Sequence, residues 1–316
     1  NAFSESQELQ TEGFLSLNLP KVISRSPLLT GAGAFHSPWN IFIDQDKNIS
    51  IDSQSTFNKL SLRGEDFELR NLKGKILIKE NLQLLDNKKI RFSYYKKSNP
   101  FNRVDYNLME PYLSSNFPFS IENIRFKDWQ IGPLQAKIEI EQNLLSIPRF
   151  NLALFDGNLA GKFFLDFNPK NIRVGLLSRL SKLKPSLLVS TGQASLKEDS
   201  HASISARTNF IFNLSKSLVE GKVDITEIGS EQLVGLIDII DPNYEDDKLV
   251  QLRQLLGLGY PTRVTIKMNR GTMDLAVDLV ITGVKKTQEI YGIPLTPIIQ
   301  SKLGDIQNTL KSIPVE

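Results

Sequence analysis

The chain has 316 residues, of which 40% are hydrophobic and 23% charged, and its formal net charge is +3. This composition provides for one or two folded domains and excludes wholesale disorder. The balance of 38 basic against 35 acidic residues lacks the basic excess of a nucleic-acid-binding domain, so we expect no nucleic-acid partner. The absence of cysteine excludes disulfides and thiolate chemistry.

The ends of the chain carry no targeting segment that the sequence reveals. The chain begins at Asn1 rather than at methionine, so we expect a processed chain or a piece of a longer one. Its first residues have neither the basic flank nor the apolar stretch of a signal peptide. No window approaches the ~20 apolar residues that a membrane-spanning helix needs. A membrane anchor is therefore expected outside these 316 residues.

Most of the chain alternates apolar and polar residues with period 2, which predicts β-strands. Residues 39–52 place two short apolar strands, at 41–43 and 49–51, around a polar loop and predict a hairpin. Short strand-like pieces follow between residues 60 and 94. Residues 97–118 contain Pro100, Pro111 and Pro118 among polar residues and predict an irregular connection.

The alternation sharpens after residue 120. Strands are predicted at 134–140, 144–147, 150–154 and 159–166, with a turn over residues 155–158. A long strand is predicted over residues 202–214. The clearest hairpin pairs residues 261–269 with residues 272–281 around Arg270-Gly271.

Helical periodicity is confined to the C-terminal part. Two helices are predicted at about 230–256, one starting at Ser230-Glu231 and ending at Asp241-Pro242, the other stopping at Gly257. A third is predicted at 296–311, starting at Thr296-Pro297. All three are amphipathic, so each needs an apolar surface to lie on.

No catalytic or metal-binding pattern is present, and we expect no enzyme, no cofactor and no metal site. The segment Gly31-Ala32-Gly33 lacks the lysine of a phosphate-binding loop. His36 and His201 have no metal-ligand spacing around them. The acidic cluster at 238–247 lacks the spacing of a calcium-binding EF-hand and is typical of a solvated turn between helices.

One segment resembles a known family. Residues 134–169 read LQAKIEIEQNLLSIPRFNLALFDGNLAGKFFLDFNP: a strand, a short strand with a proline, a strand ending in the Leu-Phe-x-Gly turn Leu154-Phe155-Asp156-Gly157, and a strand containing Gly161. This order is similar to the repeated unit of the AsmA-like family of bacterial envelope proteins. The segment from Gly259 to Val280 resembles the C-terminal part of such proteins.

The resemblance implies a bridge-like lipid-transfer protein: an elongated antiparallel β-sheet curled into a groove with an apolar interior, with a few short helices toward the C-terminus. It implies a non-enzymatic module that takes part in phospholipid transport between the inner and outer membranes. Its partners would be phospholipid acyl chains and envelope membrane proteins. The chain would be periplasmic, tethered to the inner membrane by a segment outside these residues. We divide it into a β-rich region at 1–120 and an AsmA-like region at 121–316.

Strand parity selects candidate lining residues, because side chains of alternate residues share a face. They are Ile138, Ile140, Leu152, Leu154, Ile204, Phe210, Val264, Ile266, Leu275 and Val277. Parity does not distinguish a groove that holds lipid from a closed β-sandwich, since both bury the same residues. Two other functions stay as alternatives: an assembly factor that binds outer-membrane protein segments by edge pairing, and a plain β-sandwich interaction domain.

Overall fold

The computed structural model describes residues 9–18, 30–64, 67–85, 89–94, 117–126, 129–154, 157–168, 170–183, 204–214, 216 and 218–295. These residues are mainly β, with sixteen strands and two short helices, which confirms the predicted fold class. The chain divides into two compact units, residues 1–173 (unit 1) and residues 174–316 (unit 2).

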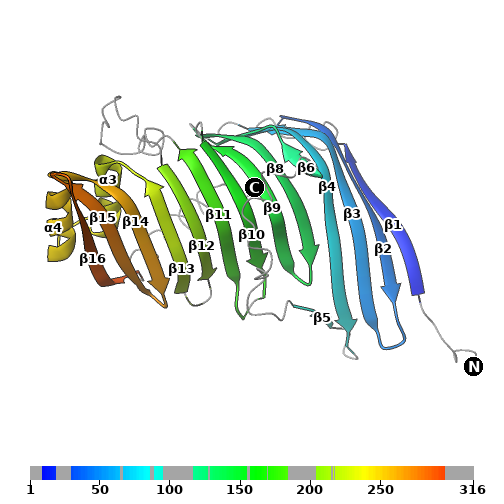
Figure 1. Cartoon of the computed structure of the whole chain (residues 1–316). Coiled ribbons are helices and arrows are strands. Elements are labelled where there is room, and N and C mark those ends of the chain that lie inside the picture. The colour runs from blue at the N-terminus through cyan, green and yellow to red at the C-terminus, as the bar shows by residue number, and fades with distance from the viewer. Residues whose placement is uncertain are drawn as a thin grey trace, which may run out of the picture. The chain divides into compact units, whose positions relative to one another are not determined.

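The described part of unit 1 contains ten strands (Figure 1). Their bounds are β1 (Leu9–Asn18), β2 (Thr30–Ile43), β3 (Asn48–Arg63), β4 (Phe67–Leu84), β5 (Ile90–Phe92), β6 (Phe119–Ile121), β7 (Asn123–Phe126), β8 (Trp129–Glu141), β9 (Leu144–Leu154) and β10 (Gly157–Asp166). The hydrogen-bonded order is β1-β2-β3-β4-β6-β8-β9-β10, and β5 and β7 also pair with β4. One contact, between β4 and β8, is parallel.

The described part of unit 2 contains six strands and two helices. Their bounds are β11 (Arg173–Leu183, which starts with the last residue of unit 1), β12 (Ile204–Asn213), β13 (Leu218–Glu227), α3 (Ser230–Ile240), α4 (Asp247–Leu256), β14 (Gly259–Asn269), β15 (Thr272–Ile281) and β16 (Val284–Pro294). The strands follow one another in sequence order, and β12 to β16 are antiparallel to their neighbours. Neither unit splits its described strands into two separate sheets, as a sandwich would require.

The clearest predicted hairpin is confirmed as β14 and β15. Its two turn residues, Arg270 and Gly271, have φ values of 46° and 97°, the positive angles that a two-residue type I′ turn requires. The next hairpin uses the same geometry at Thr282 and Gly283, with φ values of 48° and 82°. Such turns match the twist of antiparallel strands, so they fix the register of β14 to β16.

Six strands were not predicted from the sequence: β1, β6, β7, β11, β13 and β16. Residues 284–294 contain Lys285, Lys286, Gln288 and Glu289, which interrupt the apolar alternation. Charged residues are typical of end strands, and β16 ends the strand order of unit 2. Conversely, the two strands predicted at 144–147 and 150–154 form the single strand β9. An irregularity opposite Lys137–Glu139, next to Pro148, absorbs the break in the pattern.

The two predicted helices are confirmed as α3 and α4, with differences at their starts. The residue before α3 is Gly229, and the Ser230 hydroxyl, which was expected to cap the helix, donates to the carbonyl of Gly259 instead (3.2 Å). α4 begins at Asp247 because the Asp246 carboxylate accepts from the backbone N–H groups of Lys248 and Leu249 (2.9 and 3.2 Å). The helix predicted at 296–311 lies outside the described residues.

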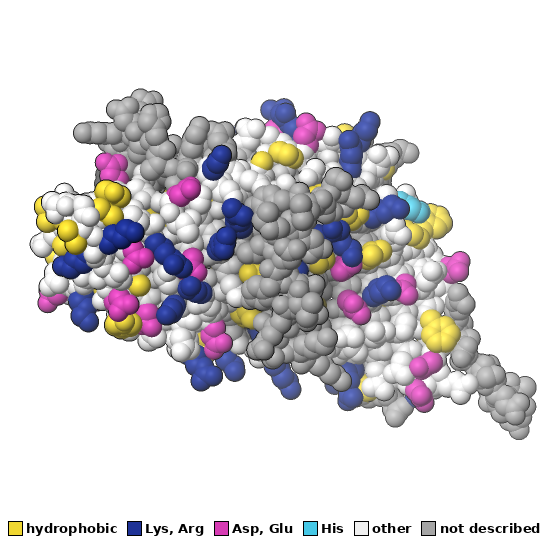
Figure 2. All heavy atoms as spheres, viewed as in Figure 1, with side chains coloured by type: hydrophobic (Ala, Val, Ile, Leu, Met, Phe, Trp, Pro, Cys, Tyr) yellow, Lys and Arg dark blue, Asp and Glu magenta, His cyan; other side chains and the backbone are white. Residues whose placement is uncertain are grey.

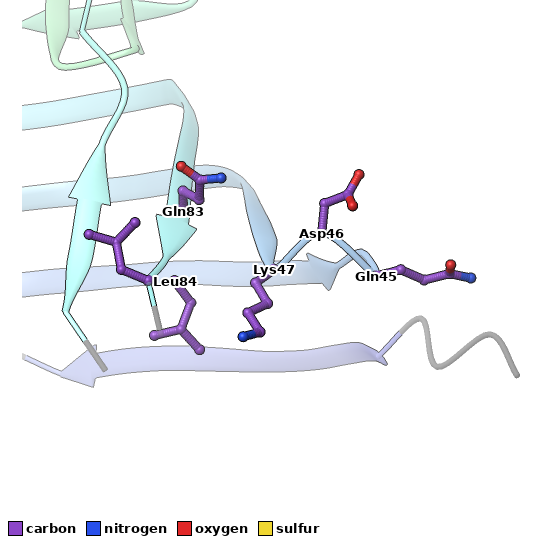
Figure 3. A pocket seen from close by; sticks show the side chains of 6 residues that line it. Gln45, Asp46, Lys47, Gln83 and Leu84 are labelled. Atoms are coloured by element: carbon purple, nitrogen blue, oxygen red, sulfur yellow. The ribbon is translucent and has the colours of Figure 1, made fainter. Parts of the chain in front are cut away.

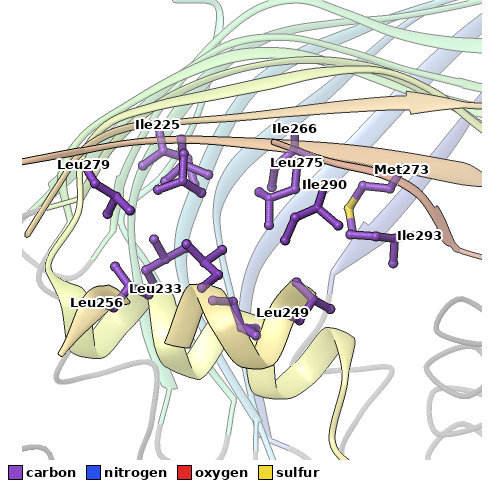
Figure 4. Packing of buried hydrophobic residues seen from close by; sticks show 14 of the residues in the cluster. Ile225, Leu233, Leu249, Leu256, Ile266, Met273, Leu275, Leu279, Ile290 and Ile293 are labelled. Carbon is purple, nitrogen blue, oxygen red and sulfur yellow. The ribbon is translucent and has the colours of Figure 1, made fainter. Parts of the chain in front are cut away.

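Both helices pack on the sheet of unit 2 and close its core (Figure 4). Leu233 and Ile237 lie four residues apart on α3, and both are fully buried. In Figure 4 the labelled leucines of both helices point toward the sheet. The core consists of Ala206, Ile225, Leu233, Ile237, Leu249, Leu252, Leu256, Val264, Ile266, Met273, Leu275, Val277, Leu279, Ile290, Ile293 and Leu295.

The compact units are divided after Arg173, whereas the sequence division falls after residue 120. Strand β4 pairs with β6, β7 and β8, so hydrogen bonds of unit 1 cross the position of the sequence boundary. The boundary after residue 120 was placed at a change in sequence pattern. The division into two compact units does not test it, so it stays a prediction.

Candidate functional site

Unit 1 carries one apolar sheet face that extends over several strands. Directly paired residues lie on the same face of a sheet, and the register pairs Ile41 with Ile51, Ile76 with Ile138, and Ile78 with Ile140. We call this surface the apolar face. Its members are Phe35, Trp39, Ile41, Ile49, Ile51, Phe57, Ile76, Ile78, Leu82, Leu134, Ile138, Ile140, Leu145, Ile147, Leu152, Leu154, Leu159, Phe163 and Leu165.

The members named above are only partly buried, whereas the register places four buried apolar residues on the same face, which are 0–7% exposed: Phe119, Ile121, Ala136 and Phe150. Along β2, residues of the apolar face alternate with exposed residues of the opposite face, and the same holds from Lys73 to Asn81 of β4. A second layer packed on a sheet buries such side chains completely, as α3 and α4 do in unit 2. Both described helices contact strands of unit 2, β14 and β16. The named members of the apolar face therefore keep part of their surface exposed on either side of a buried centre at Phe119, Ala136 and Phe150.

Four of the ten predicted lining residues belong to the apolar face. Ile138 and Ile140 lie on β8, and Leu152 and Leu154 lie on β9, where Leu152 pairs with Leu134. All four are partly exposed. The opposite face of β8 carries Gln135, Lys137 and Glu139 in the alternate positions, so the predicted parity of this strand is the one that the structure has.

Four others lie in the closed core of unit 2. Val264 pairs with Val277, and Ile266 pairs with Leu275, so the four side chains are neighbours on one face. Their exposed fractions are 0%, 0%, 8% and 1%, because α3 and α4 cover them. In unit 2, the surface predicted to contact a ligand is thus occupied by the protein's own helices.

The remaining two predicted residues lie on β12. Ile204 is partly buried and packs against the core of unit 2. Phe210 is partly exposed and pairs with Gly221 of β13. A methyl group at Gly221 would come within 2.2 Å of the Asn209 carbonyl oxygen and 2.5 Å of the Phe210 Cα atom, so the backbone of β12 approaches too closely for a side chain at this position.

A cluster of three serines interrupts the apolar face. The Ser37 hydroxyl lies 2.9 Å from that of Ser53 and 2.8 Å from that of Ser55. All three side chains are buried among larger neighbours, so their hydroxyl groups satisfy one another. The three hydroxyl groups are therefore paired with one another, and none of them is left as an unpaired polar group on the apolar face.

Glu80 places a carboxylate on the apolar face, between Ile78 and Leu82 along β4 and opposite Ile51 of β3. Both of its oxygens accept from the backbone N–H of Asn143, at 3.1 and 3.2 Å. Burial raises the pKa of Glu80 above its ordinary value, the Asn143 hydrogen bond opposes this, and the charge of Glu141 adds to it. Asn143 lies in the turn between β8 and β9, so Glu80 fastens that turn to β4.

The outer face of unit 2, opposite its core, is polar. Lys and Arg side chains alternate there with Asp and Glu over β13 to β16 (Figure 2). A shallow cavity of about 320 Å³ on this face is lined by residues that include Lys222, Arg263 and Asp278. Asp224 bonds to Lys222, Arg263 and Thr265 at 2.6 to 3.0 Å. Burial raises the pKa of Asp224, but these three hydrogen bonds lower it more, so its pKa lies below the ordinary value.

A second cavity, of about 250 Å³, lies at the ends of β2, β3 and β4 (Figure 3). Gln45, Asp46 and Lys47 from the β2–β3 turn and Gln83, Leu84 and Leu85 from the end of β4 line it. It is open and polar, and no cluster of titratable side chains converges in it. It resembles the gap between two hairpin ends more than a binding site.

The remaining candidate groups take part in local structure. The acidic segment between α3 and α4 is engaged: Asp241 accepts from the backbone N–H groups of Glu245 and Asp246, and Arg253 contacts both Asp238 and Asp241. His36 lies on the face of β2 opposite the apolar face, beside the Phe14 ring. His201 lies outside the described residues. Within the described residues, no three His, Asp or Glu side chains are grouped to hold a metal ion.

Sequence reasoning did not include the members of the apolar face that lie on β2, β3 and β4. The signal was present, because Ile41, Ile49 and Ile51 flank the predicted hairpin turn and Ile76 and Ile78 alternate with exposed residues. The parallel pairing of β4 with β8 joins these residues to Ile138 and Ile140. A pairing between strands some 60 residues apart leaves no local pattern.

No family model, curated protein or solved structure matches the chain. Neither described helix has the length and apolarity needed to cross a bilayer.

Proposed function

We propose that this chain is a non-enzymatic lipid-binding module, and that phospholipid acyl chains lie on the apolar face of unit 1. The observation that carries the proposal is the partly exposed apolar surface shared by β2, β3, β4, β8, β9 and β10. The resemblance of residues 134–169 to AsmA-like proteins supplies the setting. In that setting the module takes part in phospholipid transport between inner and outer membranes, in the periplasm, with envelope membrane proteins as further partners.

The dimensions and chemistry of the face suit an acyl chain. Strands β3 and β4 contain 16 and 18 residues, and at ~3.4 Å per residue they run for roughly 50–60 Å. Each buried methylene of a ligand contributes about 0.8 kcal/mol without any directional contact. A surface of this kind therefore needs no deep pocket and no set of converging polar groups to hold lipid.

Site-specific photo-crosslinking tests the proposal. A photo-reactive amino acid is placed at Ile78 or Ile138, which are partly exposed on the apolar face, and captured lipid is identified by mass spectrometry after irradiation in cells. Leu77 is the matched control, because it is apolar, adjacent to Ile78 and 38% exposed, but lies on the opposite face. We expect phospholipid at Ile78 and Ile138 and little at Leu77.

Two outcomes would overturn the proposal. If neither Ile78 nor Ile138 captures lipid, the apolar face is not an acyl-chain surface. If Leu77 captures as much as Ile78, capture follows exposure alone and the sheet face has no selectivity. Lipid extraction of the purified protein provides a second readout that needs no substitution.

A second function, the binding of an extended outer-membrane protein segment by strand addition, is favoured by the β1 edge. β1 ends the strand order of unit 1, its residues 11–16 are exposed, and Phe14 is 75% exposed. The other end strand, β16, carries Lys285, Lys286 and Pro294, which discourage strand addition. Tight binding of a peptide from the last strand of an outer-membrane protein, with no lipid recovered, would favour this function over acyl-chain binding.

A further inference from the structure

The cavity of about 320 Å³ on the outer face of unit 2 is centred on a short side chain, and we call it the outer hollow. Ala276 lies at this centre, where it pairs with Thr265 of β14 and with Glu289 of β16. Asp274 and Asp278 flank it on the same face of β15. The hollow exists because one alanine stands among longer side chains, and its volume is near the lower end of the range for small-molecule sites.

Tyr291 forms the wall of the outer hollow on the side of β16, which ends the strand order of unit 2. The residue is 62% exposed. Its hydroxyl donates a hydrogen bond to the Glu289 carboxylate, and this bond raises the pKa of Tyr291 above its ordinary value. The adjacent backbone is also fastened, because the N–H of Gly292 donates to Asp274 (3.0 Å). The ring is therefore held beside the hollow with more than half of its surface uncovered.

Groups that accept and groups that donate hydrogen bonds are both available around the hollow. Asp274, Asp278 and Glu289 each use one carboxylate oxygen in a hydrogen bond within the sheet. In the part of the chain that the structure describes, the second oxygen of each accepts no hydrogen bond, and the exposed Lys267 has no ion-pair partner. A carboxylate oxygen accepts and an ammonium group donates, so the hollow suits a ligand whose groups do both.

The charges that line the outer hollow offset one another. Three basic and three acidic side chains line it: Lys222, Arg263, Lys267, Asp274, Asp278 and Glu289. Asp224 lies beside them and bonds to Lys222 (2.6 Å) and to Arg263 (3.0 Å), so no positive excess is left to attract a phosphate or a carboxylate. Figure 2 shows the two signs intermingled over this face. The balance favours an uncharged ligand.

We propose that the outer hollow binds a neutral saccharide. A hexose ring is uncharged, its hydroxyl groups both donate and accept hydrogen bonds, and one of its faces presents mainly C–H groups. That face would stack on the Tyr291 ring. The hydroxyl groups would donate to the second oxygens of Asp274, Asp278 and Glu289 and accept from Lys267. This site goes beyond the proposed function and does not depend on lipid occupying the apolar face of unit 1.

Ligand-detected NMR titration of the whole chain tests the inference. The probes are three neutral tetrasaccharides: maltotetraose, cellotetraose and the tetramer of N-acetylglucosamine. We expect at least one of them to bind. Ala276→Gln fills the hollow with an uncharged side chain, and Tyr291→Ala removes the ring. Each should weaken binding roughly tenfold or more, since stacking and access to the surrounding polar groups are lost. Raising the ionic strength from roughly 0.05 to 0.3 M should leave the affinity nearly unchanged, because salt screens charged ligands.

Matched controls lie on the same face outside the hollow. Val280→Gln introduces the same side chain four residues beyond Ala276 on β15, and Tyr260→Ala removes a tyrosine that is 59% exposed and pairs with Val280. Neither residue lines the hollow, so both variants should bind saccharide as the wild type does. Unchanged thermal melting shows that each variant is folded.

The inference is overturned if none of the three saccharides binds, or if Tyr291→Ala or a folded Ala276→Gln chain binds as the wild type does. It is also overturned if inorganic phosphate displaces the saccharide or if salt weakens binding steeply, because the hollow would then select charged ligands. Equal losses in the controls would overturn it as well, since any residue of the outer face would then serve. Lipid crosslinking at Ile78 is a separate readout, so failure of the outer hollow and failure of the proposed function are distinguishable.

Discussion

The two units bury the same kind of strand pattern in different ways. In unit 1, Ile138 lies between the polar residues Lys137 and Glu139 and remains partly exposed. In unit 2, Ile266 lies between the polar residues Thr265 and Lys267 in the same manner and is only 8% exposed. The strands of the two units show the same alternation of side chains between the two faces of the sheet. The difference is that the chain of unit 2 includes α3 and α4, whose leucines lie over the sheet.

This contrast shows that a ligand of unit 1 would take the place that α3 and α4 have in unit 2. The helices of unit 2 supply the second layer that an amphipathic sheet needs in water. On the apolar face of unit 1 the described helices supply no such layer, and the side chains retain surface for contact with something else. Acyl chains are our proposal for that partner. The predictions below test the contrast, beginning with the largest expected effect.

Ile266→Asp should unfold unit 2. The substitution places a carboxylate in a closed core with no partner, and we expect a loss of more than about 4 kcal/mol in the free energy of unfolding. Both tryptophans of the chain, Trp39 and Trp129, lie in unit 1, so their fluorescence follows unit 1 while circular dichroism follows both units. Lys267→Asp, on the opposite face of the same strand, is the control. An Ile266→Asp chain that melts like the control would show that the core is not closed.

Leu252→Ala should destabilise unit 2 by about 2–5 kcal/mol, the usual range for a fully buried leucine that leaves a cavity. Leu252 lies on α4 in the core. Thermal melting by circular dichroism measures the effect, and tryptophan fluorescence should be unchanged. An unchanged melting curve would mean that α4 does not form the second layer.

Ile140→Asp should leave unit 1 folded, at a cost of about 1–2 kcal/mol. Ile140 is partly exposed on the apolar face, so water can reach a carboxylate at this position. Lipid recovered with the purified variant should fall relative to the wild type, while the tryptophan-monitored transition shifts only slightly. Unfolding of unit 1 as complete as that expected for Ile266→Asp in unit 2 would show that both units have closed cores.

Glu80 in unit 1 should respond to acid in the opposite direction to Asp224 and Asp241 in unit 2, with the smallest effect of the four. The pKa values of Asp44 and Glu68, also in unit 1, are lowered, so these two groups respond as those of unit 2 do. The folded-state pKa values of Asp224 and Asp241 lie below the usual value of about 3.9, so the unfolded chain takes up protons first and these groups lose their contribution as the pH falls through that range. The folded-state pKa of Glu80 lies above the usual value of about 4.3, so the folded chain takes up protons first and this group adds stability as the pH falls.

Denaturant unfolding at pH values between 3 and 6, roughly spanning these carboxyl groups, measures the two responses. Glu80→Gln should remove the contribution of Glu80 to the tryptophan-monitored transition of unit 1. Asp241→Asn should reduce the acid sensitivity of unit 2. If Glu80→Gln leaves the pH profile of unit 1 unaltered, the carboxylate is hydrated and the turn at Asn143 is held by other contacts.

Many elements of the fold were predictable from local sequence pattern. Period-2 alternation predicted β8, β10, β12, β14 and β15, and helical spacing that stops at Gly257 predicted α4. These elements were predictable because their physical causes are neighbours in the sequence. β16 was missed because an end strand carries charged residues in place of one apolar row.

The candidate site was predictable only in part. Parity placed Ile138, Ile140, Leu152 and Leu154 on one face, and the structure has them there. Their neighbours on β4 came from a parallel pairing between distant segments, and no turn or spacing signals such a pairing.

The sequence by itself determined which side chains share a face, because alternation along a strand and a spacing of three or four along a helix follow from backbone geometry. It also determined that α3 and α4 need an apolar surface. Only the tertiary structure decided where they lie: over Val264, Ile266, Leu275 and Val277, four of the residues that parity assigned to a ligand. Parity fixes the direction of a side chain but not what lies opposite it, since the covering layer comes from residues elsewhere in the chain or from another molecule.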